Sequence, residues 1–334
     1  MYTPPFSVSA KSIRLISDIS ARLERYIIRM EQSGSLYLRR VNRIKTIQGS
    51  LAIEGNTFTE SQITDVLEGK RVIAPRRELQ EVRNAIKAYE SFTSFDPFSK
   101  RDLLKAHGIM MEGLVDHPGY FRTGGVCVAG KEGIIHIAPP ANRVSVLMGD
   151  LFEWLKQADD HMLVKSCVFH YEFEFIHPFD DGNGRIGRLW QSRILAEWNP
   201  VFEYVPVENL VYAHQREYYQ AINRSTEESN SGIFTEFMLE IILKALDTRS
   251  SIQPDSVHDS AGFFVNDPIN DPVNDPINQI LSLISGKPDI TYEGLAEKTG
   301  NSRATIKRKI TALKKEGKLC RRGSNKTGFW EILP

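Results

Sequence analysis

One stretch of twelve residues, from His177 to Arg188, constrains this chain more than any other part of it. It reads His-Pro-Phe-Asp-Asp-Gly-Asn-Gly-Arg-Ile-Gly-Arg and follows residues 163–176, which are rich in apolar residues and contain no Gly or Pro. After it, four apolar residues recur at helical spacing: Ile186, Leu189, Trp190 and Ile194. The stretch is therefore predicted to be a loop between two helices, with Gly182 to Gly184 at the N-terminus of the second helix.

The residue types in this loop suit the binding of phosphate groups. A helix N-terminus offers unpaired N–H groups and the positive end of the helix dipole, and glycines let the backbone wrap around an anion. Arg185 and Arg188 project from the first helical turn, and arginine forks match phosphate oxygens. Asp181 could hold a Mg²⁺ that bridges the phosphates, and His177 could take a proton from an incoming hydroxyl. Phe179 is expected to anchor the loop in the core.

Two alternative interpretations of the loop compete with phosphate binding. An Asp-Gly-Asn-Gly turn with solvated arginines explains the glycines, but it does not explain the full stretch. A metal site formed by His170, Glu174 and His177 is the other alternative, and its spacing matches none of the established zinc motifs. His170 is instead expected to lie in the core or to support a residue of the site.

The loop matches, position for position, the H-P-F-x-[D/E]-G-N-G-R-x-x-R signature of the Fic family, and the chain resembles that family. The resemblance implies transfer of AMP from ATP to a hydroxyl side chain of a target protein, with release of pyrophosphate. It also implies a role for each polar residue of the loop: His177 as general base, Asp181 as Mg²⁺ ligand, the amides of Gly182, Asn183 and Gly184 as anion hole, and Arg185 with Arg188 on the triphosphate.

A second segment, at the end of a helix predicted over residues 36–52, carries a carboxylate that needs a partner. Glu54 follows this helix directly, where the helix dipole disfavours a negative charge. Together with Ser50 and Gly55, it resembles the inhibitory [S/T]-x-x-x-E-[G/N] motif of many Fic proteins. The resemblance implies that Glu54 pairs with Arg188 and blocks placement of the γ-phosphate, while Ser50 supports the helix. The alternative is a solvated helix end.

The pattern changes from helical to extended between residues 119 and 140. Two short apolar segments, residues 126–128 and 134–137, flank a Gly-rich turn and predict a β-hairpin. An isolated hairpin has an exposed edge to which an extended target segment can add as a strand. The hairpin resembles the flap of Fic proteins, which implies that Val126, Cys127 and Val128 dock the target. The alternative is a hairpin that only caps the core.

Tyr219 falls where members of the family present an aromatic residue to the adenine ring. The resemblance implies the same contact here, and a buried core tyrosine is the alternative. Thr226 stands where an asparagine often follows in the family. The sequence therefore supports the phosphate contacts better than the adenine contacts.

The C-terminal part of the chain reads as a separate basic module. Residues 249–278 form a predicted linker that contains three Asn-Asp-Pro-Ile/Val repeats, where Pro at every fourth position forbids a regular helix. From residue 279 on, the order helix, helix, long helix and strand pair resembles a winged helix-turn-helix. From Lys287 to the end, twelve Lys and Arg against five Asp and Glu give a charge of +7 in a chain of zero net charge.

This charge favours DNA binding by the module, with Arg303, Lys307 and Arg308 on the predicted recognition helix. The alternative is a winged helix used for dimerisation or target binding.

Composition excludes several other classes of protein. With 334 residues, 25% charged and 41% hydrophobic, the chain can bury a sizeable core and a second small domain. Three widely spaced cysteines fit a reducing compartment better than a disulfide framework or a zinc site. No apolar run approaches the roughly 18 residues of a membrane span, and the N-terminus lacks the basic region of a signal peptide. A cytoplasmic protein with no membrane contact is expected.

Six further helices are predicted. The apolar pattern indicates helices over residues 11–30, 76–95, 142–156 and 206–246, the last interrupted near 225–232. The N-caps Thr59 and Ser99 indicate helices over 60–68 and 100–114. The predicted fold is mostly α, a Fic-type helical core with a small β-hairpin flap and a C-terminal winged helix-turn-helix domain. The predicted domains are residues 1–98 with the inhibitory helix at 36–55, a catalytic core at 99–248, the linker at 249–278 and the winged helix at 279–334.

The predicted function is a protein adenylyltransferase autoinhibited by Glu54. It would use ATP and Mg²⁺ to modify a Ser, Thr or Tyr hydroxyl of a target, or of itself. AMP removal or transfer of another phosphate-containing group remains an alternative, as does a DNA-binding regulator whose core senses nucleotide. Fic proteins often tune inhibition through dimer contacts, so the resemblance also points to a homodimer.

Overall fold

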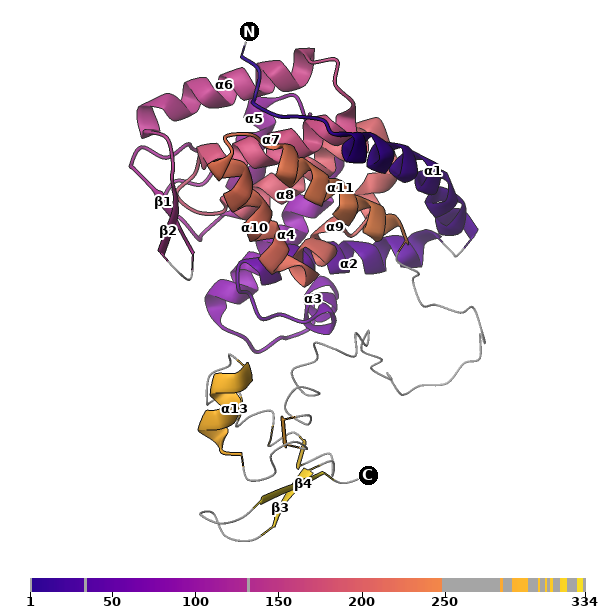
Figure 1. The fold of residues 1–334 in the computed structure, drawn as a ribbon, viewed down its shortest axis with the longest axis vertical. Coiled ribbons are helices and arrows are strands. Elements are labelled where there is room, and N and C mark those ends of the chain that lie inside the picture. Colours follow the sequence, from indigo (N-terminus) through magenta and orange to yellow (C-terminus); the bar gives the residue numbers. More distant parts are fainter. Residues whose placement is uncertain are drawn as a thin grey trace. The chain divides into compact units, whose positions relative to one another are not determined.

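The computed structural model describes residues 2–32, 35–130, 133–247, 283–284, 290–299, 306, 310, 313–314, 319–322 and 329–332. The chain divides into two compact units, Met1–Pro254 and Asp255–Pro334. Figure 1 colours the first from indigo to orange and the described part of the second in yellow. Each unit is described by itself.

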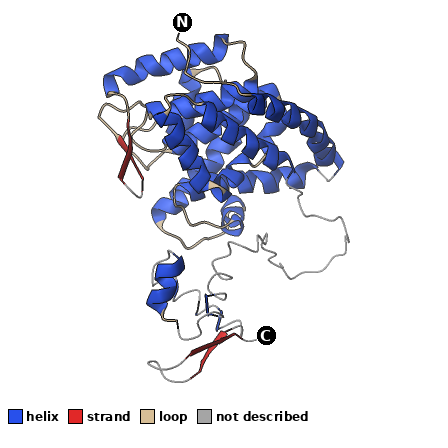
Figure 2. Ribbon diagram, viewed as in Figure 1, coloured by secondary structure: helices blue, strands red, loops and turns tan. Residues whose placement is uncertain are grey.

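The first unit is built almost entirely of helices, as Figure 2 shows. Its helices, in chain order, are α1 (Ala10–Gln32), α2 (Ser35–Ile53), α3 (Glu60–Leu67), α4 (Arg76–Glu90), α5 (Lys100–Met110), α6 (Ala141–Gln157), α7 (Met162–Ile176), α8 (Asn183–Trp198), α9 (Val207–Ala213), α10 (Gln215–Glu227) and α11 (Gly232–Asp247). Two short 3₁₀ helices follow α4 and α8, at Phe92–Ser94 and Pro200–Tyr204. The prediction of a mostly α fold is confirmed.

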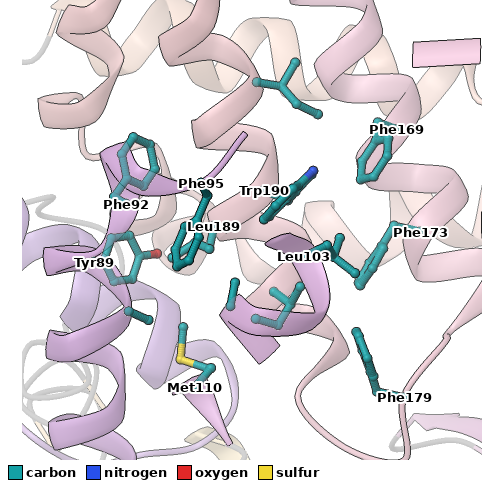
Figure 3. Packing of buried hydrophobic residues seen from close by; sticks show 14 of the residues in the cluster. Tyr89, Phe92, Phe95, Leu103, Met110, Phe169, Phe173, Phe179, Leu189 and Trp190 are labelled. Atoms are coloured by element: carbon teal, nitrogen blue, oxygen red, sulfur yellow. The ribbon is translucent and has the colours of Figure 1, made fainter. Parts of the chain in front are cut away.

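Helices α7 and α8 form the centre of the first unit and pack against each other (Figure 1). Twelve of the fifteen residues of α7 are buried, so this helix is enclosed on all sides, as its apolar sequence requires. Figure 3 shows Phe169 and Phe173 of α7 in a row that ends at Phe179 of the following loop. Trp190 of α8 lies in the same cluster. The loop between the two central helices therefore begins inside the core.

Three helix predictions differ from the structure. The helix predicted over residues 76–95 ends at Glu90 and is followed by the 3₁₀ helix at Phe92–Ser94. The helix predicted over residues 100–114 ends at Met110, where the chain turns through Gly113 at a φ of +70°. Met111 continues the apolar pattern from outside the helix, because it is fully buried under the central loop. The segment predicted to be helical over residues 206–246, with an interruption near 225–232, also breaks at His214, between α9 and α10, with no Gly or Pro to mark the break.

Two strands, β1 (Cys127–Gly130) and β2 (Gly133–Ile137), form an antiparallel pair at the position of the predicted hairpin. The register pairs Cys127 with Ile137 and shifts between Val128 and Ala129. A further bond from the amide of Ala138 to the carbonyl of Val126 closes the base of the pair. The hairpin lies at the margin of the unit, next to the start of α6 (Figure 1).

The second unit contains α13 (Tyr292–Thr299) and an antiparallel pair of strands, β3 (Leu319–Arg322) and β4 (Phe329–Ile332). Its small core includes Ile290, Leu295 and Trp330, whose indole N–H donates to the Ile290 carbonyl at 3.0 Å. The helix at 292–299 and the strand pair lie where the sequence predicts them. The predicted linker and the proposed DNA-facing residues Arg303, Lys307 and Arg308 lie outside the described residues. In the described ranges, every helix is too short or too polar to cross a bilayer.

Candidate active site

The loop from His177 to Gly182 joins the C-terminus of α7 to the N-terminus of α8. His177 ends α7 in the left-handed region, at φ 49° and ψ 63°, which is uncommon for a residue with a side chain. Gly182 precedes α8 at φ 86°, and a Cβ there would come within 2.6 Å of the Met111 sulfur. Gly182 is thus required both by its backbone conformation and by the space that Met111 leaves.

Phe179 and Asn183 fix the shape of this loop. Phe179 is fully buried, as predicted. The Asn183 side chain accepts from the Phe179 amide at 2.9 Å and donates to the Phe179 carbonyl at 2.8 Å. The Asn183 side chain therefore closes the loop on itself, while its backbone forms the first residue of α8.

His107 of α5 contacts the loop through both the face of its ring and its Nε2. Its ring stacks on Phe179, with ring centroids 3.7 Å apart and planes within 6°. The Gly119 amide donates to His107 Nδ1 at 2.8 Å, so the proton lies on Nε2, which donates to the Asp181 carbonyl at 3.1 Å. Burial lowers the pKa of His107 to about 4, which keeps the ring neutral at physiological pH. His107 therefore holds the backbone of Asp181 in place.

The ring of His177 lies against the last turn of α7. Its Nδ1 is 3.4 Å from the Glu174 carbonyl, a long contact in which only the ring can donate. This contact favours the tautomer with the proton on Nδ1, in which Nε2 is the basic nitrogen. The His177 carbonyl accepts from Arg122 Nε at 2.7 Å.

Asp181 and Arg185 belong to a network of charges that also includes α4. One oxygen of Asp181 accepts from the Gly182 amide at 2.6 Å and from Arg185 Nη2 at 2.9 Å, and the other accepts from Arg77 Nη2 at 3.0 Å. Arg185 Nη1 also lies 3.8 Å from Glu81 Oε1. Within the described part of the chain, the buried Nε of Arg185 has no hydrogen-bond partner. A buried donor of this kind indicates an acceptor that the protein does not supply.

Arg188 is buried and is held by the end of α2. Its Nη2 donates to Glu54 Oε1 at 2.6 Å and to the Ser50 carbonyl at 2.9 Å, and its Nε donates to Ser50 Oγ at 3.3 Å. Burial on its own would lower the pKa of Arg188, but Glu54 and the other groups around the guanidinium together outweigh burial and raise that pKa. Ser50 therefore contacts the arginine directly, beyond the supporting role that the sequence analysis gave it.

The carboxylate of Glu54 also lies against the first turn of α8. A Cβ at Gly184 would overlap Glu54 Oε1 and would lie 2.9 Å from Arg188 Nη1. The carboxylate thus occupies the position at a helix N-terminus that suits an anion. An anion from the chain itself fills the predicted phosphate site.

Close packing fixes the position of α2 beside α8 and α9. A Cβ at Gly49 would lie 2.6 Å from the Asn209 backbone, so only glycine lets α2 approach α9 this closely. After the helix, Asn56 donates to Glu81 Oε2 at 2.9 Å. The segment that follows α2 and the Asp181 network are therefore both tied to α4.

The remaining site predictions have mixed outcomes. His170 is fully buried and contacts Gln191 at 2.6 Å and the Tyr218 hydroxyl at 3.1 Å, so it is a core residue, as predicted. Across the described ranges no three His, Cys, Asp or Glu residues are close enough to hold a metal, so the alternative site of His170, Glu174 and His177 does not form. Tyr219 is 39% exposed, whereas Tyr218 is buried, so the alternative of a buried core tyrosine at Tyr219 is wrong.

Four residues that contact the loop or its charged network were not predicted: Arg77, Glu81, His107 and Arg122. None belongs to a local motif, and an arginine or glutamate on a predicted helix ordinarily reads as solvated. Arg122 offers the nearest signal, because it lies where the helical pattern gives way to the hairpin. The predicted flap residues Val126, Cys127 and Val128 lie at the base and first strand of that hairpin.

Comparison with known families identifies both units of the chain. The sequence model of the Fic/DOC family matches residues 97–195, and that of the winged helix-turn-helix DNA-binding family matches residues 275–319. The protein adenylyltransferase Fic of Culex quinquefasciatus is 30% identical over 218 residues, and that of Drosophila mojavensis is 30% identical over 212 residues. These matches cover 61% and 60% of this chain and 41% and 40% of the two relatives. The chain thus spans about two fifths of the length of these curated relatives.

Solved structures give a match over the whole chain. A Fic family protein from Desulfovibrio desulfuricans G20 is 38% identical, with a TM-score of 0.72 over 99% of this chain and 98% of that one. Fic-1 of C. elegans is 22% identical, with a TM-score of 0.57 over 71% of this chain and 74% of that one, and shares the fold.

Proposed function

Because this chain belongs to the Fic family, we propose that it is a protein adenylyltransferase, which transfers AMP from ATP to a hydroxyl side chain of a target protein. One arrangement carries the proposal. A histidine with a basic Nε2 ends α7, and a carboxylate with two buried arginines begins α8. The curated relatives from insects are named protein adenylyltransferases, which supports the same chemistry here.

The N-terminus of α8 would bind the triphosphate of ATP. The amides of Gly182, Asn183 and Gly184 would face its oxygens, and the unpartnered Nε of Arg185 supplies a further donor. Arg188 would add a second guanidinium once Glu54 has left it. Bidentate arginine contacts are among the strongest that proteins make to phosphate. Tyr219 is our candidate for the adenine contact, because it is 39% exposed and, besides partial burial, the charges of Glu54 and Arg188 act on its pKa.

Asp181 fits a Mg²⁺ that is shared with the substrate. Mg²⁺ in proteins is commonly held by one or two carboxylates together with phosphate oxygens and water. Asp181 supplies one carboxylate, and its side chain is 38% exposed. Bound there, the ion would offset the charge of the phosphates. Arg185 and Arg77 already hold the same carboxylate in a fixed orientation.

His177 would act as the general base. As the oxygen of a target Ser, Thr or Tyr attacks the α-phosphorus, its proton passes to His177 Nε2. A bond forms between that oxygen and phosphorus, and the bond from the α-phosphorus to the bridging oxygen breaks. Pyrophosphate leaves, and AMP remains on the target. The arginines and the amides of α8 stabilise the charge that develops on the phosphate oxygens. The hairpin, through Val126, Cys127 and Val128, would hold the target segment.

The contact between Glu54 and Arg188 would inhibit this reaction. Glu54 occupies both the guanidinium and the space above Gly184 that a phosphate would need. ATP would therefore bind productively only when Glu54 moves away. The same contact explains why a carboxylate stands at the end of α2, where the helix dipole opposes it.

The test uses purified protein, Mg²⁺ and ATP labelled at either the α- or the γ-phosphate. Three proteins are compared: the wild type, Glu54→Gly, and Glu54→Gly combined with His177→Ala. We expect protein-bound label, on a target or on the protein itself, from α-labelled ATP only. It should be strong in Glu54→Gly and lost in the double variant, while nucleotide binding survives in both.

Label from the γ-phosphate, or none from the α-phosphate in Glu54→Gly with cell lysate as target, would contradict AMP transfer. In the second case, release of AMP from a previously modified target would identify AMP removal as the activity of the site. Retained nucleotide binding without either activity would identify a nucleotide sensor.

We further propose that the second unit binds DNA. Its match to a winged helix-turn-helix DNA-binding family and its +7 charge from Lys287 to the end support this function. Replacing Arg303, Lys307 and Arg308 together by Ala should abolish a gel shift on genomic DNA fragments and leave AMP transfer intact. An unchanged gel shift in this variant would place any DNA contact elsewhere, and no shift with the wild type would overturn the proposal.

A further inference from the structure

We propose that Arg122 is a positioning residue that fixes the β1–β2 hairpin relative to His177, so that a docked target hydroxyl faces the base. The inference rests on the proposed function, because the hairpin must hold a target for this position to matter. Arg122 itself touches neither reacting group. It acts through the backbone of the two segments that do.

The side chain of Arg122 forms hydrogen bonds with two segments, the end of α7 and the ends of the β1–β2 hairpin. Toward the base, Nε donates to the His177 carbonyl at 2.7 Å and Nη2 donates to the Ile176 carbonyl at 3.3 Å. Toward the hairpin, Nη1 donates to the Gly124 carbonyl at 2.8 Å and Nη2 donates to the Pro139 carbonyl at 2.5 Å. Gly124 precedes β1 and Pro139 follows β2, so one guanidinium bonds both ends of the hairpin and the end of α7.

The backbone of Arg122 adds a further link to the loop. Its amide donates to the Pro178 carbonyl at 2.9 Å. Three successive carbonyls, those of Ile176, His177 and Pro178, therefore all accept from Arg122. These carbonyls set the position of the His177 side chain, because His177 lies in the middle of the three.

The surroundings of Arg122 make this link specific to arginine. The side chain is buried, and no carboxylate forms an ion pair with it in the described part of the chain. Burial lowers the pKa of Arg122, and the charge of Asp180 opposes that shift. The charge is stabilised by carbonyls at the negative end of the α7 dipole. A planar fork with fixed donor directions suits four carbonyls on different sides, whereas a lysine ammonium offers three donors around one point.

Such a link matters for the hairpin because its strands are short. It consists of two short strands whose register shifts between Val128 and Ala129. A hairpin of two strands is marginally stable by itself. A displacement of about 1 Å between reacting groups can reduce a rate by about a hundredfold. Fixing the hairpin ends to the residue that carries the base is therefore a direct way to keep target and base in register.

The first test measures coupling in the protein without nucleotide. Hydrogen exchange is compared in the wild type, Arg122→Gln and Arg122→Lys, with Arg143→Gln as control, because Arg143 is an exposed arginine at the start of α6. In both Arg122 variants we expect hydrogen exchange to become faster in residues 124–138 and also in residues 176–177. In the Arg143→Gln control we expect no change in either segment. Acceleration at α7 alone would overturn the proposal, because Arg122 would then only cap that helix.

The second test separates target alignment from nucleotide binding. In the Glu54→Gly background, Arg122→Lys should reduce kcat/KM for AMP transfer to the protein target by about tenfold or more. Its affinity for a non-hydrolysable ATP analogue should stay within about twofold of the Glu54→Gly parent. Equal losses in both quantities would overturn the proposal, because they would indicate general damage to the site.

The two tests also distinguish failure of this inference from failure of the proposed function. If Glu54→Gly transfers no AMP, the proposed activity fails, and hydrogen exchange still decides whether Arg122 couples the hairpin to the loop. If Arg122→Gln does not fold, the milder Arg122→Lys carries both measurements. Unchanged exchange in both segments of a folded Arg122→Lys would overturn the coupling whatever the activity.

Discussion

The loop after α7 and the end of α2 meet at the same helix N-terminus, but the protein holds them in different ways. The loop enters the core through Phe179, which is fully buried, stacks on His107 and is bonded by Asn183. The end of α2 reaches the site through the side chain of Glu54, which is 33% exposed and, among the described residues, accepts a hydrogen bond only from Arg188. The loop cannot move without disturbing the core, whereas under the proposed function the phosphates would only have to displace the partly exposed side chain of Glu54.

The largest expected effect tests the first half of this comparison. Phe179→Ala removes a fully buried ring that packs on His107, Phe121 and Phe173. We expect the free energy of unfolding to fall by about 3–5 kcal/mol, the usual cost of truncating a buried phenylalanine. Urea denaturation measures the change. Tyr120→Ala is the matched control, because Tyr120 is 71% exposed near the same loop and should change stability by less than about 0.5 kcal/mol. Similar small losses in both variants would mean that the core does not hold the loop.

The second prediction concerns a buried carboxyl behind α2. Glu208 lies in the first turn of α9, which packs on α2, and it accepts from Ser192 Oγ of α8 at 2.8 Å. Burial raises the pKa of Glu208 from its ordinary 4.5 to about 7. Between these values the folded state binds more protons than the unfolded state, so stability falls as pH rises through this window.

Glu208→Gln removes the ionisable group, and with it the loss of stability at high pH, and keeps the shape of the side chain. At pH 8 the variant should be more stable than the wild type by up to about 3 kcal/mol, and at pH 4 it should be nearly equal. Urea denaturation at the two pH values gives the difference. Glu172 and Glu174 have raised pKa values as well, so the stability of both proteins still falls with rising pH. Only the difference in stability between the two proteins tests Glu208. If the free energy of unfolding changed with pH identically in both proteins, Glu208 would be ionised in the folded state throughout this pH range.

The third prediction tests the second half of the comparison. Glu54→Gln keeps the length of the side chain but removes the charge that neutralises buried Arg188. Without nucleotide, we expect the free energy of unfolding to fall by about 1–2 kcal/mol, since Glu54 is partly solvated and Ser50 still accepts from Arg188. A saturating ATP analogue should then raise the melting temperature of this variant more than that of the wild type. Equal increases would mean that Glu54 does not compete with the phosphates.

The sequence was most informative where chemistry is local. The loop signature, the position of Glu54 and the amphipathic helices follow from neighbouring residues and their spacing. The hairpin was predicted from the change of the apolar pattern from helical to extended near residue 126. These features need no knowledge of distant contacts, because turn residues and hydrophobic periodicity act over a few positions.

The contacts that hold the site come from distant segments and left no such signal. Arg77 and Asp181 are 104 positions apart, and Arg122 and His177 are 55 apart. The sequence of an amphipathic helix does not distinguish an arginine that is solvated from one that pairs with a carboxylate of a distant segment. The early end of α5 was missed for a related reason, because Met111 continues the apolar pattern while packing from a turn.

The smallest expected effect asks how far the loop depends on α4. Arg77 pairs with Asp181 at 3.0 Å, but its side chain is 59% exposed. Arg77→Ala should therefore change the free energy of unfolding by no more than about 1 kcal/mol, as for other exposed ion pairs. The difference from wild type should shrink in about 1 M salt, where the Debye length is about 3 Å.

Arg76→Ala is the control for this last variant, because Arg76 is an exposed neighbour with no recorded ion pair among the described residues. A small, salt-sensitive effect at Arg77 would show that Arg185, the Gly182 amide and His107 hold Asp181 without help from α4. A loss well above that of Arg76→Ala, persisting in high salt, would break the comparison. The loop would then depend on an exposed ion pair, and α4 would link Asp181 to the segment that follows α2 through Glu81 and Asn56.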